Sequence, residues 1–182
     1  TLAMIGLVIL LFGVSTITAY LGEGMAAQRL VLTNADDMLK LMMSTVYIDM
    51  RILGHDTESA MVVQGLFSVA MAALVVWVFA RKRDPQLSFV VFIAASVMAT
   101  PYLMAYDLIA LTWASALLLR HPAMDKKGRA LAVYTAALPL LHFFAGAMNF
   151  AGMALLPLFV ILWCLPHLRH VPPQNGAIPG ET

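Results

Sequence analysis

One carboxylate stands alone in a long apolar run of this chain. Asp107 lies in the stretch ATPYLMAYDL (residues 99–108), within a run from 87 to 119 that contains no other charged residue. A carboxylate inside an apolar span is unfavourable by about 2.5–3.5 kcal/mol, and such groups are usually paired or face a cavity. Asp107 therefore has two interpretations. It is a structural residue bound by a neighbouring hydroxyl, or it lines an outward-facing cavity, where it would bind sugar hydroxyls or orient a catalytic partner.

Aromatic and amide side chains accompany this carboxylate. Tyr102 and Tyr106 have i,i+4 spacing and would share one face of a helix. They would stack on a sugar ring or belong to the aromatic belt of a membrane interface, which suits Tyr102 better. Gln64 lies within a second apolar run. Like His142 in a later run, it is interpreted as a packing residue with its polar atoms satisfied.

The cation best placed to bind phosphate is Arg51, in MMSTVYIDMRILGHD (residues 42–56). A guanidinium offers a bidentate fork that suits phosphate, and Lys40 and Arg29 are further cations of the surrounding loop 20–60. The alternative is a solvated charge or an ion pair with Asp49 or Asp56. The apolar spacing fits an interfacial amphipathic helix only loosely, and Gly54 is expected to end it.

Several other classes of site find little support. His142, in the middle of an apolar stretch, is interpreted as a packing residue, with a proton relay as the alternative. No acidic residue or second histidine lies within one turn of it, so metal binding is not expected there. Cys164 is the single cysteine, and no nucleophile triad, phosphate loop or zinc motif is present. We expect no cofactor.

The elements that would position these residues are membrane helices. The 182 residues are 62% hydrophobic and only 12% charged, whereas about a quarter of the residues of a soluble domain are charged. The apolar residues form long unbroken runs, which predict an all-α, polytopic transmembrane bundle. The net charge of +1 and the absence of a basic stripe argue against nucleic-acid binding. Because the chain begins at Thr1 within an apolar run, we expect a fragment rather than a signal peptide.

Two runs, 87–119 and 130–165, are too long for single spans. A helix rises about 1.5 Å per residue, and the hydrocarbon core is about 30 Å thick. Eight of the eleven Lys and Arg residues fall in 81–83, 120–129 and Arg169. If both long runs are hairpins, all eight lie on the cytoplasmic side, as the positive-inside rule requires. Loop 20–60, with six acidic residues, then lies outside.

The turns of these hairpins are predicted at Thr100-Pro101 and at residues 148–152. Proline disfavours helix at the preceding residue and is favoured at the first helical position, so a helix should start at Pro101 with Thr100 as its N-cap. Pro139 and Pro157 are expected to kink their helices. A disordered tail follows at 171–182. The predicted spans are 2–19, 61–80, 87–99, 101–119, 130–147 and 151–165.

An ordered set of short motifs carries a family resemblance. It consists of QRLVL (28–32), Ser44 and Val46 followed by RILG (51–54), then Gln64, RKR (81–83) and ATPYLMAYDL. The set resembles the C-terminal half of bacterial membrane glycosyltransferases of glycosyltransferase family 87, which are similar to polyprenol-phosphate-mannose-dependent α-mannosyltransferases. The resemblance covers residues 2–119 and fades beyond them.

The resemblance implies a GT-C fold in the bacterial inner membrane, with the site facing outward and the C-terminus in the cytoplasm. The enzyme would move a hexose, mannose by analogy, from a polyprenyl-phosphate donor to a lipid or glycan acceptor. The family's catalytic acid is expected upstream, in the N-terminal half of the same protein, so this chain alone would be inactive. Arg51, Gln64, Pro101, Tyr102 and Asp107 would be supporting residues.

Two other classes remain open on the sequence. A broken helix with a carboxylate also suits a transporter or flippase component. Such a protein would carry a matching broken helix in its other half, and residues 130–165 match poorly because they hold no carboxylate. The third class is a structural membrane module without a site.

Overall fold

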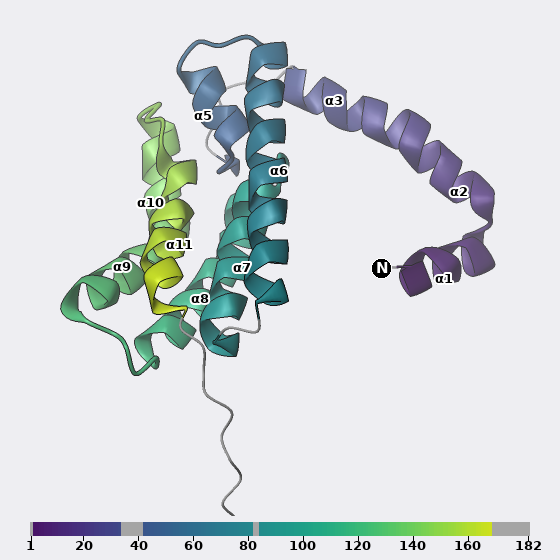
Figure 1. Ribbon diagram of the computed structural model, residues 1–182. Helices are drawn as coiled ribbons and strands as arrows, with labels where there is room; N and C mark the ends of the chain where they lie inside the picture. Colours follow the sequence, from purple (N-terminus) through teal and green to yellow (C-terminus); the bar gives the residue numbers. More distant parts are fainter. Residues whose placement is uncertain (1, 34–41, 82–83, 169–182) are drawn as a thin grey trace, which may run out of the picture. The chain divides into compact units, whose positions relative to one another are not determined.

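The computed structural model describes residues 2–33, 42–81 and 84–168, and within them the chain is helical (Figure 1). The expected all-α class is therefore confirmed. The chain divides into two compact units, residues 1–38 and 39–182. The described contact between extended segments is an isolated antiparallel bridge between Met43 and Met104.

The N-terminal unit is one helical path with a sharp break. Helix α1 (Leu2–Phe12) is followed by α2 (Val14–Ala19), the π-helical turn η1 (Tyr20–Gly24) and α3 (Met25–Thr33). Gly13 has φ of 80°, a conformation that favours glycine, and the helices on either side differ in direction by 110°. The predicted continuous span 2–19 is thus wrong in two respects. The helix breaks at Gly13, and it continues to Thr33 into the expected loop.

The second unit contains the remaining helices (Figure 1). They are α5 (Val46–Ile52), α6 (Thr57–Ala80), α7 (Pro85–Ala99), η2 (Ala105–Leu108), α8 (Ile109–Leu119), α9 (Lys126–Ala136), α10 (Leu138–Ala147), η3 (Met153–Leu155) and α11 (Leu156–His167). Helix α7 packs against α6, α8 and α11, and α8 packs against α9. Helix α7 is accordingly the central helix of this unit, with Leu87, Val90, Val91 and Ala94 fully buried.

Helix α6 is the longest element and agrees with the predicted span 61–80. It begins four residues earlier, because the Asp56 carboxylate caps its N-terminus by accepting from the backbone N–H of Ser59. Its 24 residues have a length of about 36 Å at the usual helical rise, enough for the hydrocarbon core. Among the described residues it is the single unbroken helix long and apolar enough to cross a membrane.

The first predicted hairpin break is present, but the next helix begins later than expected. Helix α7 ends at Ala99, and Thr100 has the extended conformation typical of a residue before proline. However, the Thr100 hydroxyl donates back to the Ser96 carbonyl instead of capping a new helix. Residues 101–102 form a turn, Met104 is extended in its bridge with Met43, and helix resumes at Ala105. The predicted start at Pro101 is therefore wrong.

The second long run breaks twice. Helices α10 and α11 are separated by a turn in which Asn149 and Gly152 have φ of 51° and 107°, where a turn was predicted. Helices α9 and α10 differ in direction by 61°, next to Pro139, which confirms the expected kink there. Pro157 lies in the first turn of α11, where proline is tolerated, and produces no kink.

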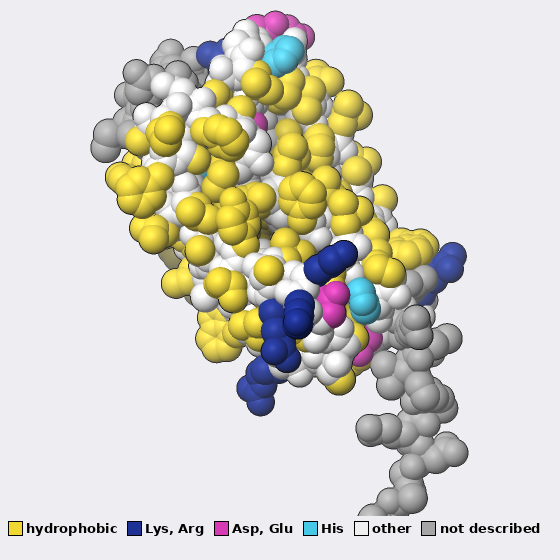
Figure 2. Space-filling view, turned by 90° about the vertical axis from the view of Figure 1, so that its left-hand side faces the viewer, with side chains coloured by type: hydrophobic (Ala, Val, Ile, Leu, Met, Phe, Trp, Pro, Cys, Tyr) yellow, Lys and Arg dark blue, Asp and Glu magenta, His cyan; other side chains and the backbone are white. Residues whose placement is uncertain are grey.

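These breaks leave several apolar helices short of a full span. Helices of 10–17 residues cover Pro85–Ala99, Ala105–Leu119 and Met153–His167. The described chain has one spanning helix, or up to three if each bent pair, α1 with α2–α3 and α9 with α10, crosses as one unit. Hydrophobic side chains form a broad exposed band over the second unit, and Lys and Arg gather below it (Figure 2). Such a surface is compatible with membrane association.

Candidate functional site

The segment that carries Arg51 is a short, well-capped helix. Thr45 caps α5 by accepting from the backbone N–H of Ile48, and Gly54 follows its last turn with φ of 89°. The N–H of His55 donates to the Met50 carbonyl and the N–H of Gly54 to the Arg51 carbonyl. This pattern is a Schellman motif, and it confirms the predicted role of Gly54. The helix is not an interfacial surface helix, because its first turn (Val46, Tyr47, Ile48) is buried.

Arg51 is fixed by this same turn. One terminal nitrogen, Nη1, donates to the backbone carbonyl of His55 at 2.9 Å. The Arg51 charge also contributes to lowering the pKa of Asp56, although backbone and side-chain hydrogen bonds from Ser59 are the larger causes. The guanidinium is therefore oriented by the backbone, and its remaining N–H groups lie at a partly exposed position.

Gln64 joins three helices. Its Oε1 accepts from the backbone N–H of Tyr47 at 3.0 Å, and its Nε2 donates to the Met98 carbonyl at 3.0 Å. The side chain is only 2% exposed. The neighbouring Ser68 hydroxyl donates to the Ala99 carbonyl. Carbonyls at a helix C-terminus have no partner within the helix, so these two side chains of α6 satisfy the buried end of α7. Gln64 thus holds α5 against α6 and α7.

A second contact brings the turn of the first hairpin to α5. The backbone N–H of Ser44 donates to the Leu103 carbonyl at 3.2 Å, beside the bridge between Met43 and Met104. Both sides of this contact are buried, with Met43 1% and Leu103 6% exposed. The segments 43–54 and 98–108, which are distant in sequence, therefore form one assembly, which we name the α5 end.

Asp107 is a capping residue at this α5 end and not a carboxylate deep in a span. Its Oδ2 accepts from the backbone N–H of Met104 at 3.1 Å, at the start of η2, and the residue is exposed. Tyr106 is 70% exposed, whereas Tyr102 is partly buried in the turn before η2. The two tyrosines do not share a helix face, because the helix starts only at Ala105.

Asp49 is a feature of the α5 end that the sequence did not single out, except as a partner for Arg51. Its Oδ2 accepts from the backbone N–H of Ala154 at 3.2 Å, which ties α5 to the turn before α11. Burial raises the pKa of Asp49 to about 6, opposed by hydrogen bonds from the backbone of Gly152 and Ala154. In the sequence, the position of this acidic residue between the apolar residues Ile48 and Met50 could have indicated that Asp49 is partly buried.

The remaining predicted residues are not brought into this assembly by a described contact. Lys40 lies outside the described residues. His142 is 4% exposed, and neither ring nitrogen has a hydrogen-bond partner in the described part of the chain. The expected burial of His142 is therefore confirmed, but the hydrogen bond expected of a satisfied packing residue is not seen among the described residues. Within 2–33, 42–81 and 84–168 no three His, Cys, Asp or Glu side chains are grouped to bind a metal ion.

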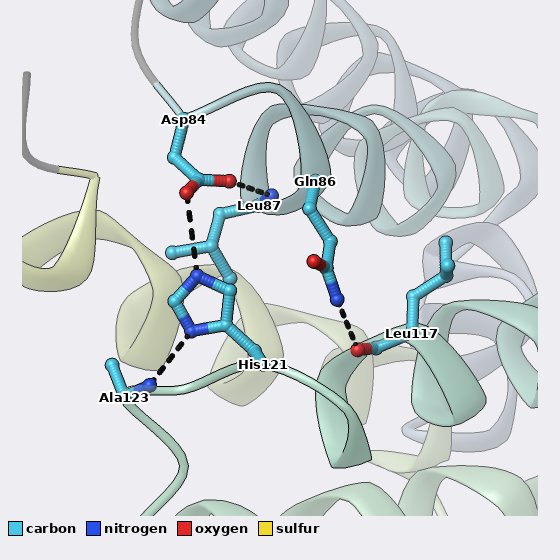
Figure 3. Close-up of polar contacts among 6 residues, drawn as sticks. All are labelled: Asp84, Gln86, Leu87, Leu117, His121 and Ala123. Atoms are coloured by element: carbon cyan, nitrogen blue, oxygen red, sulfur yellow. Dashed lines mark hydrogen bonds and ion pairs between the residues drawn. The ribbon is translucent and has the colours of Figure 1, made fainter. Parts of the chain in front are cut away.

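At the other end of α7 a different polar cluster fixes the chain (Figure 3). Asp84 caps α7 by accepting from the N–H of Leu87, and its second oxygen lies 3.4 Å from Nε2 of His121. Because His121 Nδ1 accepts from the backbone N–H of Ala123, Nε2 carries the proton that faces Asp84. Gln86 Nε2 donates to the Leu117 carbonyl and joins α7 to α8. We name this region the basic end. It includes the exposed cations Arg81, Arg120, Lys126, Lys127 and Arg129.

Comparisons of the chain with protein-family models, with curated proteins and with solved structures found no match.

Proposed function

We propose that this chain is part of an integral membrane glycosyltransferase. The enzyme moves a hexose, mannose by resemblance, from a polyprenyl-phosphate donor to a lipid or glycan acceptor. One observation carries the proposal. Three of the five motifs behind the resemblance, Ser44 to Gly54, Gln64 and the stretch 99–108, meet at the α5 end through hydrogen bonds. Arg81 of RKR lies at the basic end and QRLVL lies in the N-terminal unit, so these two motifs are not part of the α5 end.

The chemistry of the α5 end suits a lipid-phosphate donor. Transfer of a hexose leaves negative charge on the departing phosphate, which requires a cation or hydrogen-bond donors. Arg51 is held by the His55 carbonyl through one nitrogen and retains N–H groups for a phosphate oxygen. Tyr106, exposed beside the Asp107 cap, offers an aromatic face for a sugar ring. In this proposal Gln64 and Asp107 are positioning residues, and the base belongs to the N-terminal half of the protein.

The proposal includes an arrangement in the membrane. Six helical segments enter the bilayer, the α5 end and both hairpin turns face outward, and the basic end faces the cytoplasm. The distribution of charge supports this orientation, since the described cations Arg81, Arg120, Lys126, Lys127 and Arg129 flank the opposite ends of the helices from α5. In a bacterium this places the chain in the inner membrane with its C-terminus inside.

A transporter or flippase component is the second candidate, favoured by the breaks in the helices. The 110° and 61° bends and the turn at 100–104 are typical of discontinuous helices that line a translocation path. The gene product containing this chain, reconstituted in liposomes with radiolabelled polyprenyl-phosphate mannose, distinguishes the two. We expect label to appear on an acceptor lipid or glycan. Movement of the labelled donor between leaflets without transfer would reject the glycosyltransferase.

A further inference from the structure

A groove at the basic end has the composition of a lipid-binding site. It lies between the first turns of α7 and the last turn of α8, with a volume of about 530 Å³. Its lining residues are Pro85, Gln86, Phe89, Leu117 and Arg120. The hydrogen bond from Gln86 Nε2 to the Leu117 carbonyl crosses between the two helices and fixes their separation (Figure 3).

The groove combines an apolar wall with one cation. Phe89 is 48% exposed, and together with Pro85 and Leu117 it gives a surface that suits an acyl chain or glycerol backbone. Arg120 is exposed, and its guanidinium makes no side-chain hydrogen bond or ion pair within the described part of the chain. A guanidinium binds phosphate oxygens through two parallel N–H groups. A phospholipid has the matching arrangement, with a phosphate group next to its hydrocarbon part.

The charges around the groove favour an anionic ligand. Five described cations lie near this end, and all are exposed: Arg81, Arg120, Lys126, Lys127 and Arg129. The two described acids are engaged by helix N-termini. Asp84 binds the N–H of Leu87 and faces His121, and Asp125 binds the N–H of Gly128 and the indole of Trp163. The outward charge of this region is therefore positive.

The position of the groove selects a lipid over a soluble anion. Figure 2 shows Lys and Arg directly below the exposed hydrophobic band, where a bilayer surface would lie. Basic pockets between helices on the cytoplasmic side bind anionic headgroups. We propose that the groove between α7 and α8 binds one anionic glycerophospholipid, with its phosphate on Arg120 and its apolar part against Phe89. This inference requires membrane association only and is independent of the proposed sugar transfer.

Lipid titration followed by native mass spectrometry tests the site. The purified full chain in a nonionic detergent is titrated with palmitoyl-oleoyl phosphatidylglycerol and, in parallel, with the phosphatidylcholine of the same chains. We expect one phosphatidylglycerol to bind about fivefold or more tightly than phosphatidylcholine. Arg120→Ala should remove this preference. Arg129→Ala, an exposed cation of α9 outside the groove, is the matched control and should retain it.

A second variant tests the apolar wall. Phe89→Ser should weaken binding of both lipids while leaving the preference for phosphatidylglycerol. Phe89 and Arg120 are both exposed, so the circular dichroism spectrum of each variant should match that of the wild type. Equal binding of the two lipids, or equal weakening by Arg120→Ala and Arg129→Ala, would overturn the site. Displacement of phosphatidylglycerol by inorganic phosphate alone would show that the groove binds soluble anions instead.

Discussion

Asp49 and Arg51 are two positions apart on α5 and have different partners. The Asp49 carboxylate binds the backbone of Ala154, whereas the Arg51 guanidinium binds the carbonyl of His55. Of the two partners proposed from the sequence for an ion pair with Arg51, the structure supports an influence on Asp56 and gives Asp49 a separate role. Residue types thus identified the polar groups at this end, but their partners came from the turn at 152–154, far along the chain.

The raised pKa of Asp49 predicts a pH-dependent stability. Its carboxyl has a pKa of about 6 in the folded chain, against 3.8 for an aspartate without such an environment. The folded state therefore binds the proton more tightly than the unfolded state. The associated stability is fully present below pH 3.8 and is lost as the pH rises through about 6.

Asp49→Asn should remove this dependence, because the amide oxygen still accepts from Ala154 and no longer ionises. We expect the variant to be more stable than the wild type by about 1–3 kcal/mol at pH 7.5 and similar to it at pH 4. Unfolding in detergent across this pH range measures the difference. Parallel profiles for the two proteins would show that Asp49 does not titrate in this range.

At the scale of elements, the buried C-terminus of α7 depends on side chains of α6. Gln64→Leu would leave the N–H of Tyr47 and the carbonyl of Met98 without their partner in a buried site. We expect a loss of roughly 2–4 kcal/mol of stability. Thermal unfolding in detergent measures it, with Val62→Leu on the exposed face of α6 as the control. An unchanged midpoint for Gln64→Leu would mean that water replaces the amide.

The sequence predicted where helices end better than where they begin. Proline and glycine act locally, so the breaks at Thr100-Pro101 and at 148–152 and the kink at Pro139 were predicted correctly. The start of the helix after Pro101 was not. There Met104 is extended in its bridge with Met43, directly before η2 begins. A contact over sixty positions along the chain leaves no mark in the local sequence pattern.

At the α5 end, too, the roles set by local backbone conformation were predicted, whereas the roles set by distant contacts were not. Gly54 was assigned correctly, because the φ of a residue after a helix selects glycine locally. Asp107 was placed too deep, since its depth followed from the wrong helix start. Gln64 was selected as a candidate, but its hydrogen bonds to α5 and α7 were not predicted, because they depend on how those two helices pack.

At the scale of the whole molecule, the proposed topology puts the α5 end and the basic end on opposite faces of the membrane. Single cysteines in a Cys164→Ala background test it, because the native thiol is buried. A membrane-impermeant maleimide should label His55→Cys and Phe150→Cys in intact spheroplasts. It should label Lys127→Cys only after lysis. All three positions are exposed. Labelling of 127 in intact cells, or of 55 and 150 on different sides, would contradict the arrangement.

The central claim, that the α5 end acts on a lipid-phosphate sugar, is tested most directly at Arg51. The measurement is kcat/KM for transfer of labelled hexose from polyprenyl phosphate by the gene product containing this chain. We predict that Arg51→Ala lowers it about a hundredfold, that Arg51→Lys is intermediate, and that Arg129→Ala, at the basic end, has no effect. Equal kcat/KM for Arg51→Ala and the wild type, with both correctly inserted, would contradict the account.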